Sequence, residues 1–296
     1  MATPTKMPYR FLGDSRLLVS KLALNSWMYT DQTQTVEAWY EMMKTAFAQG
    51  VNFFDSAENY VLGQADVLMG DAINKRIEEG FCKHLIEGTQ AALARMRIDY
   101  VDVIFCYHPE PCNPIEETVR AMNYIIEHGW SFYWGTSNWP ASSILEACEI
   151  ADRLGLIRPV VEHSQYNFFS RDRVENEFTT LYKRYKLGVT AWSPLAFGTL
   201  SGKYTVDFPE GSRFTMEPTK RSMFGGETFT KNVEKAEKLK VIAEKLGCSL
   251  AQMSLAWRCR SYNITPEVKA EIDDIVQYVP TQPWVNHLQD IRMRHL

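Results

Sequence analysis

The stretch NFFDSAENY at residues 52–60 does most to decide the fold class of this chain. An apolar run there ends in Asp55, and a phenol, Tyr60, follows five residues later. The acid and the tyrosine come after a predicted strand and before a predicted helix, which is where β/α folds place functional side chains. A carboxylate and a tyrosine at a strand end together form a candidate proton donor.

The spacing of Asp55 and Tyr60 alone leaves two interpretations open. An acid and a tyrosine at this separation occur by chance in roughly half of chains of this length. In the structural alternative, Asp55 only caps the following turn and Tyr60 packs against a loop. Because a free tyrosine has a pKa of about 10, proton donation at neutral pH requires neighbouring charge. A lysine on an adjacent strand would supply it, and none is evident.

Predicted strands recur along the chain and alternate with amphipathic helices. They start near residues 22, 52, 101, 131, 159 and 188, which is a repeat of about 30 residues. Predicted helices include residues 35–49, 64–75 and 83–96, and another opens with Asn113 as its cap and Pro114 as its first residue. This repeat favours a parallel β/α barrel.

The N-terminal unit is different. Residues 9–12 and 17–20 flank GDSR at 13–16, which predicts a β-hairpin before the first β/α unit.

The repeat is interrupted twice. Residues 76–82 between two predicted helices are too short and polar for a buried strand, and residues 261–263 lead directly into a helix that starts at Thr265 and Pro266. Six core strands remain, whereas closure of this barrel requires eight.

Composition describes an ordinary globular protein. The 296 residues are 45% apolar and 23% charged, and no linker interrupts them, so we expect a single domain over residues 1–296. A net charge of -4 without a basic tract argues against nucleic acid as a partner. The chain has no apolar run of membrane-spanning length and no secretion signal at its start, which predicts a cytoplasmic protein without direct membrane insertion.

The cysteines and histidines do not indicate a metal site. The six cysteines occur singly and are expected to be reduced and mostly buried. The six histidines are dispersed, without the spacings of a metal-binding motif.

Several motifs occur together in one order. After residues 52–60 come DYVDVIF at 99–105, EETVRAMN at 116–123, YWGTS at 133–137 and WSPLA at 192–196. From Tyr9 onward the chain resembles an aldo-keto reductase, of the branch that includes the β subunits of voltage-gated potassium channels. The resemblance implies an eight-stranded (β/α)8 TIM barrel of the NADP-dependent oxidoreductase type. It also implies NADPH bound across the carboxyl-end face and reduction of aldehydes or ketones.

The resemblance assigns catalytic roles to Asp55 and Tyr60. Tyr60 would protonate the carbonyl oxygen while Asp55 shapes the local field. The family's catalytic lysine ends the third strand, inside the first missing segment, and neither Lys75 nor Lys83 on the flanking helices inherits its role.

The fourth catalytic position of the family falls at Tyr107, with His108 displaced by one residue. His108 is retained as a catalytic candidate against the alternative of a solvent-facing loop histidine. Adjacent strand residues point to opposite faces, so His108 replaces the family residue only if the strand end is bulged.

The resemblance also implies a set of cofactor-binding residues. Ser137, Asn138 and His163 match the positions that hold the nicotinamide carboxamide, and Trp192 matches the aromatic that stacks on the nicotinamide ring, with barrel packing as its alternative. The remaining matches are Ser193 and Leu195 in the pyrophosphate loop, Lys203 and Arg213 near the phosphates, Ser26 and Trp27 at the first strand end, and Asp55. Asn25 stands where the family usually has glycine. Without the resemblance, Lys203 and Arg213 would each be interpreted as a solvated surface charge.

The second interruption removes the eighth strand and the segment that grips the adenosine 2'-phosphate in the family. Weakened NADP(H) affinity is therefore expected, because charge-assisted bonds to that phosphate are lost. Each interruption removes a whole strand and its loop, which is the pattern of skipped exons or a faulty gene model.

Three hypotheses of function follow. The first is an NADPH-dependent reductase of small carbonyl substrates whose activity is impaired because the catalytic lysine is absent. The second is a regulatory β subunit that senses cofactor occupancy, forms a homotetramer and binds a potassium channel α subunit. The third is a truncated product without stable function.

Overall fold

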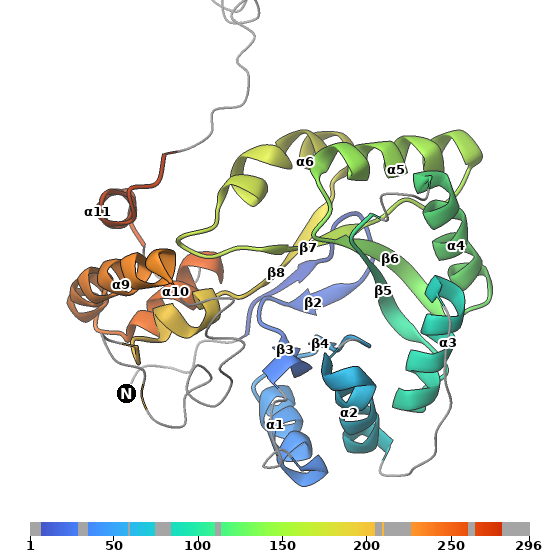
Figure 1. Ribbon diagram of the computed structural model, residues 1–296, viewed down its shortest axis with the longest axis horizontal. Helices are drawn as coiled ribbons and strands as arrows, with labels where there is room; N and C mark the ends of the chain where they lie inside the picture. Colours follow the sequence, from blue (N-terminus) through green and yellow to red (C-terminus); the bar gives the residue numbers. More distant parts are fainter. Residues whose placement is uncertain are drawn as a thin grey trace, which may run out of the picture. The chain divides into compact units, whose positions relative to one another are not determined.

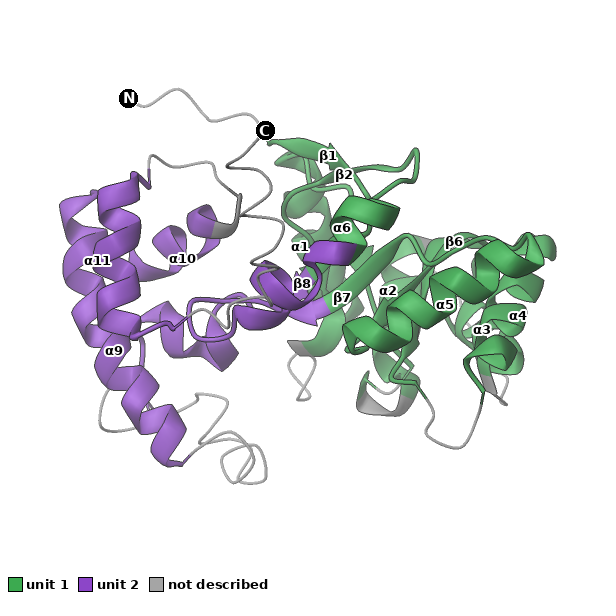
Figure 2. Cartoon of the chain, turned by 90° about the horizontal axis from the view of Figure 1, so that it is seen from above, with its two compact units in different colours: residues 1–163, 181–190 green, residues 164–180, 191–296 purple. Residues whose placement is uncertain are grey.

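The computed structural model describes residues 7–28, 35–58, 60–74, 84–109, 114–204, 209, 226–259 and 264–279. The chain divides into two compact units (Figure 2). Unit 1 comprises residues 1–163 and 181–190, and unit 2 comprises residues 164–180 and 191–296. No helix among the described residues is long and apolar enough to cross a membrane.

The described strands form three sheets (Figure 1). An antiparallel hairpin pairs β1 (Tyr9–Phe11) with β2 (Leu18–Ser20), and a parallel pair joins β3 (Leu24–Asn25) to β4 (Phe54–Asp55). The third sheet has the order β5 (Val101–Tyr107), β6 (Ser131–Ser137), β7 (Val161–Gln165) and β8 (Gly188–Trp192). The six predicted core strands therefore correspond to β3–β8, although β3, β4 and β7 begin about two or three residues later than predicted, because pairing is confined to the ends of the apolar runs.

Helices follow most of the strands. They are α1 (Val36–Ala48), α2 (Gln64–Asn74), α3 (His84–Met96), α4 (Ile115–Glu127), α5 (Ala141–Leu154), α6 (Thr179–Tyr185), α9 (Glu227–Lys245), α10 (Leu250–Cys259) and α11 (Pro266–Val276). In unit 1, neighbouring helices pack in sequence order from α1 to α5, with α3 on β5 and α4 on β6 (Figure 1).

Helix starts largely follow the sequence signals. Thr35 caps α1 by accepting a hydrogen bond from the backbone N–H of Ala38, and Thr265 caps α11 with Pro266 as its first residue, as predicted. The prediction for α4 was wrong by one position, because Pro114 has extended backbone at the N-cap and the helix begins at Ile115. Asn113 lies outside the described residues.

The predicted hairpin is confirmed, and it packs against the residues at the starts of β7 and β8. Gly13 has φ +59, and a Cβ there would lie 2.1 Å from the Val160 carbonyl oxygen and 2.7 Å from the Gly188 nitrogen. Only glycine fits this approach of the hairpin to the starts of two strands. Leu12 and Val19 of the hairpin form one buried cluster with Val161.

Close packing also requires a glycine in the centre of the sheet. A Cβ on Gly135 of β6 would lie 2.6 Å from the Val161 carbonyl oxygen and 2.9 Å from the Phe105 ring. Phe105 and Val103 of β5 pack against the Leu12, Val19 and Val161 cluster. The inner face of β5–β7 is therefore filled by side chains, as in a packed β/α core.

The buried thiols agree with the prediction. Cys106 and Cys148 are free and buried, and burial raises the pKa of each thiol to about 12. Cys248 is free and half-buried. Cys82 and Cys112 lie outside the described residues.

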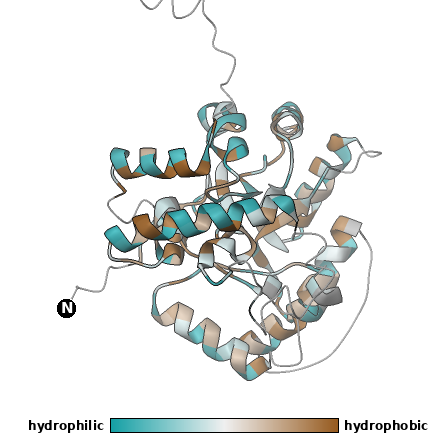
Figure 3. Cartoon of the chain, turned by 60° about the vertical axis from the view of Figure 1, so that its left-hand side comes forward, coloured by the Kyte–Doolittle hydropathy of each residue, from teal (hydrophilic) through white to brown (hydrophobic). Residues whose placement is uncertain are grey.

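Unit 2 has its own apolar core. Ile242 and Leu239 of α9, Met253 of α10 and Ile272 of α11 are buried in one cluster with Phe168. Several helices of the chain carry a hydrophobic and a hydrophilic side (Figure 3), as expected for helices packed on one face.

A buried arginine links α11 to the segment that follows β7 through ion pairs. The Arg171 side chain is 1% exposed and forms two bonds to Glu175, at 3.0 and 2.9 Å, and another to Asp273 of α11. Its guanidinium lies 3.9 Å from the centroid of the Tyr278 ring and also faces Trp257. These contacts satisfy a buried charge, so α11 depends on Arg171 for its position.

Replacing Arg171 tests that dependence. Arg171→Ala should lower the free energy of unfolding by about 3 kcal/mol, because Glu175 and Asp273 lose their cation in a partly buried site. The measurement is urea denaturation followed by tryptophan fluorescence. The matched control is Arg173→Ala, which removes an exposed side chain 3.7 Å from Glu177 and should change stability by less than about 0.5 kcal/mol. Equal effects of the two substitutions would contradict the assignment.

Candidate functional site

The site in unit 1 begins where β3 and β4 end together. Their parallel register pairs Leu24 with Phe54 and Asn25 with Asp55. The Asn25 side-chain amide donates a hydrogen bond to an Asp55 carboxylate oxygen. The next residue pair is also joined, because the Ser26 hydroxyl donates to the Ser56 hydroxyl at 2.9 Å. Side chains from residues 30 positions apart thus form one polar cluster.

A buried ion pair anchors that cluster. The Ser56 hydroxyl donates to Asp66 of α2 at 2.6 Å, and Arg95 of α3 donates to the other Asp66 oxygen at 2.8 and 3.0 Å. Asp66 is 1% exposed, so its charge requires these partners. Two helices therefore fix the loop that follows Asp55.

Asp55 is a carboxyl group in a desolvated position. Burial raises its pKa from 3.8 to about 6, and the hydrogen bond from Asn25 acts in the opposite direction with smaller effect. At neutral pH the group is ionised only at a cost, since burial disfavours the charged form.

Tyr60 lies within reach of the same amide. It opens a 3-10 turn, and its backbone N–H donates to the Ala57 carbonyl at 2.9 Å. Burial raises the pKa of the phenol, the Asn25 side-chain hydrogen bond lowers it, and Asp55 and Tyr107 raise it further. None of the groups acting on this phenol, among the described residues, is a cation. The pair predicted from the sequence is therefore assembled, in surroundings that weaken the phenol as an acid.

The fourth predicted position is occupied by Tyr107. It is the last residue of β5, and its phenol contributes to raising the pKa of Tyr60. His108 follows with φ +50 and an exposed side chain, and its ring centroid lies 4.5 Å from that of Tyr107. The described hydrogen bond and ring contact of His108 are with Ser137 and Tyr107 and not with Asp55 or Tyr60, so its catalytic assignment gains no support.

The predicted nicotinamide residues of unit 1 meet at the ends of β6 and β7. Ser137 pairs with His163 in register, and its hydroxyl donates to the His163 carbonyl at 3.4 Å. Asn138 follows with φ +61 and donates its backbone N–H to the same carbonyl at 3.0 Å. The His163 ring lies 2.8 Å from the Thr190 hydroxyl. Hydrogen-bonding groups of the kind that hold a carboxamide are therefore present at one edge.

The predicted cofactor residues of unit 2 follow β8 in a tight loop. Trp192 is half-buried beside Phe197, and the Ser193 hydroxyl accepts the Phe197 backbone N–H at 2.9 Å. The Leu195 carbonyl accepts two backbone N–H groups of the same loop. Lys203 is exposed, and its ammonium lies 5.1 Å from the Tyr204 ring centroid. Arg213 lies outside the described residues.

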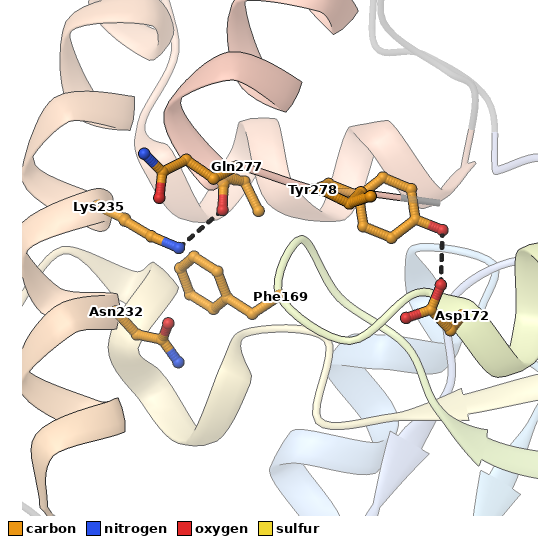
Figure 4. Close-up of a pocket in the computed structure, with 8 residues that line it drawn as sticks. Phe169, Asp172, Asn232, Lys235, Gln277 and Tyr278 are labelled. Carbon is orange, nitrogen blue, oxygen red and sulfur yellow. Dashed lines mark hydrogen bonds between the residues drawn. The ribbon is translucent and has the colours of Figure 1, made fainter. Parts of the chain in front are cut away.

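A hollow of about 350 Å³ in unit 2 has another lining (Figure 4). Its residues include Phe169, Lys235 and Tyr278, and none of the predicted cofactor residues is among them. Lys235 donates there to the Val276 carbonyl at 2.7 Å, and Tyr278 donates to Asp172 at 3.1 Å. Within the described ranges there is also no group of three or more His, Cys, Asp or Glu residues arranged to hold a metal.

The comparison with protein families decides the identity. The family model described as the aldo/keto reductase family matches residues 21–272. This chain belongs to the aldo/keto reductase family.

Two plant relatives narrow the branch. The chain is 42% identical over 281 residues to a probable voltage-gated potassium channel subunit beta of Arabidopsis thaliana, covering 88% of this chain and 85% of the relative. It is 41% identical, with the same coverage, to a protein of the same description from Oryza sativa subsp. japonica. The family generally binds NADP(H).

Sequence patterns did not reveal part of this candidate site. The residues not predicted are Ser56, Asp66 and Arg95, and the contact of Asn25 with Asp55 was not predicted either. The departure of Asn25 from the family's glycine was the only available signal. The Asp66–Arg95 pair joins residues 29 positions apart and carries no local pattern.

The raised pKa of Asp55 predicts a pH dependence of stability. Its folded-state pKa of about 6 exceeds the unfolded value, so the folded state binds the extra proton and loses stability as the pH rises from about 4 to about 6. Above that range the charge costs about 3 kcal/mol. Asp55→Asn should remove this loss, and the measurement is the free energy of unfolding at several pH values.

The control is Asp102→Asn, which alters an exposed carboxyl on β5. It should leave the pH dependence of the original chain in place. If Asp55→Asn and the original chain lose stability equally between pH 4 and 7, Asp55 is not the titrating group.

Proposed function

We propose that this chain is an NADPH-dependent aldo-keto reductase that reduces small aldehydes or ketones slowly. The observation that carries the proposal is the meeting of Asp55, Tyr60 and Asn25 at the ends of β3 and β4, with no cation acting on Tyr60 among the described residues. In this proposal Tyr60 is the reacting phenol, and no described residue supplies the positive charge that would make it a stronger acid.

Tyr60 acts as the proton donor in this proposal. Its phenol transfers a proton to the carbonyl oxygen of the substrate, while the nicotinamide of bound NADPH supplies the hydride. Because the pKa of Tyr60 is raised, the phenol gives up its proton less readily. Asp55 adds negative charge beside the phenol whenever it is ionised, which opposes proton loss further.

The cofactor-binding groups fit one half of NADPH better than the other. The hydroxyl of Ser137, the amide of Asn138 and the imidazole of His163 suit the carboxamide, and Trp192 offers an aromatic face to the nicotinamide ring. In the same proposal, Ser26, Trp27 and Asp55 line the nicotinamide side, Ser193 and Leu195 bind the pyrophosphate, and Lys203 and Arg213 lie near the phosphates.

We further propose that both units belong to one barrel domain over residues 1–296. In this proposal, the third and eighth strands of the family's eight-stranded barrel are missing, and the strands labelled β3–β8 correspond to the other six. The family match spans parts of both units. The alignment with the Arabidopsis relative has 281 positions but covers 88% of 296 residues, about 260, so about 20 positions have no counterpart here. Among the described strands, β4 pairs only with β3 and β5 only with β6. Such edges favour association with other chains.

Three proteins would test the chemistry. They are the unaltered chain, Tyr60→Phe, and a version in which the missing third strand of the family's barrel is rebuilt with a lysine at its end. NADPH oxidation with 4-nitrobenzaldehyde should be slow in the first and lost in the second. The rebuilt chain should be faster by roughly a hundred to ten thousand fold, the usual worth of general-acid catalysis. Positioning alone permits some residual turnover.

The rebuilt chain also serves as the control for folding. If the unaltered chain reduces the aldehyde as fast as the rebuilt one, the missing strand is not needed for catalysis and the impaired-enzyme proposal is wrong.

Cofactor affinity gives a separate prediction. NADPH should bind weakly and with little preference over NADH, because the residues proposed for the nicotinamide are present whereas the 2'-phosphate segment is missing. Titration of both cofactors against tryptophan fluorescence tests this, with Trp192→Phe as the variant that should lose most of the signal change. Sub-micromolar affinity with a strong preference for NADPH would show that the phosphate site is intact.

A second candidate function rests on the names of the relatives. Both are described as probable voltage-gated potassium channel subunits beta. In that function this chain is a cytoplasmic regulatory subunit that forms a homotetramer and binds a channel α subunit, with cofactor occupancy as its signal. Co-purification with a channel α subunit and a tetrameric mass would favour it over an enzyme acting alone. An aggregated product without a cooperative unfolding transition would favour the third hypothesis, a truncated protein.

A further inference from the structure

The Asn25 side chain has a single possible orientation in its hydrogen-bond network. Its oxygen accepts the backbone N–H of Trp27 at 2.7 Å. A backbone N–H can only donate, so the amide oxygen must face Trp27 and the NH2 group must face the opposite way. That NH2 group donates to Asp55.

A side-chain amide has two N–H donors, and one of them donates to the Asp55 carboxylate. The Asn25 side chain also acts on Tyr60, because it lowers the pKa of the phenol. Asn25 is half-buried, so its hydrogen bond to Asp55 is partly shielded from water, which strengthens the bond.

The backbone gives this amide its place. Asn25 and Asp55 are register partners in the parallel pair β3–β4, and partners in a parallel pair point to the same face. The following partners, Ser26 and Ser56, are joined by their hydroxyls and anchored through Asp66 to Arg95. These contacts fix the backbone that carries the Asn25 amide beside Asp55.

We propose that Asn25 is a positioning residue, and that its amide fixes the orientation of the Asp55 carboxyl beside Tyr60. This inference rests on the proposed reductase function, and it assigns to Asn25 a role that glycine at this position could not have. A neutral amide offers donors without adding charge. It therefore orients the Asp55 carboxyl but leaves both acidic groups harder to ionise than a lysine would.

The titration of the Asp55 carboxyl tests this role without any assay of activity. Carboxyl carbon NMR on the full chain, with the Asp55 resonance identified by its absence in Asp55→Asn, should give a midpoint of about 6. In Asn25→Ala the midpoint should rise by about one pH unit, because the carboxylate loses a hydrogen bond that favours its charged form. In Asn25→Asp it should rise further, since a second carboxyl group then lies beside the first.

Asn52→Ala is the matched control. Asn52 lies on the same segment, and its amide bonds the hairpin at Leu18 and Ser20 rather than Asp55. This variant should lower the melting temperature, because it removes the bonds to the hairpin, but it should leave the Asp55 midpoint unchanged. An unchanged midpoint in Asn25→Ala and Asn25→Asp, or an equal shift in Asn52→Ala, would overturn the proposal.

Turnover separates this proposal from the function on which it rests. If the chain reduces 4-nitrobenzaldehyde, Asn25→Ala should lower kcat about tenfold, the worth of one such bond in the transition state. If the chain is inactive but the Asp55 midpoint shifts as expected, the reductase function fails and the positioning role of Asn25 stands. If turnover is present and the midpoint does not move, the positioning role fails alone.

Discussion

The parallel pairing of β3 with β4 is the constraint on which the site depends. It joins only two residue pairs in register, yet the second of them is Asn25 with Asp55. The serines that follow extend the pairing through side chains to the buried Asp66 and Arg95. Because α2 and α3 supply that ion pair, the packing of two helices sets the position of the reacting groups. A short stretch of sheet is sufficient here because buried polar contacts continue it.

The two interruptions of the repeat have different consequences. Near the first, the groups that act on Tyr60 among the described residues are the amide of Asn25 and acidic side chains. The second precedes α11, whose N-cap Thr265 and buried contacts with Arg171 still hold the helix in unit 2. Local packing is therefore retained near both interruptions.

Sequence patterns predicted most of the local structure, because the signals were local. The hairpin was indicated by its turn, α11 by Thr265 and Pro266, and the β/α order by apolar runs about 30 residues apart. Asp55 and Tyr60 followed from a motif, and the structure brings them together. The Asn25 contact, the Asp66–Arg95 pair and the Arg171 network could not be predicted, since each depends on the register or packing of distant elements. The position of Pro114 was missed because proline is compatible with both the N-cap and the first helical turn.

Among the described residues, the groups that act on Tyr60 are an amide and acidic side chains, and none is a cation. The most direct measurement is an NMR titration of the chain labelled at the tyrosine ring carbon that bears the hydroxyl. The Tyr60 resonance is identified by its absence in Tyr60→Phe. The account predicts a Tyr60 pKa above the ordinary value of about 10. A value well below 10 would show that a positive charge lies beside the phenol, and it would contradict the assignment of an amide and acidic neighbours to Tyr60.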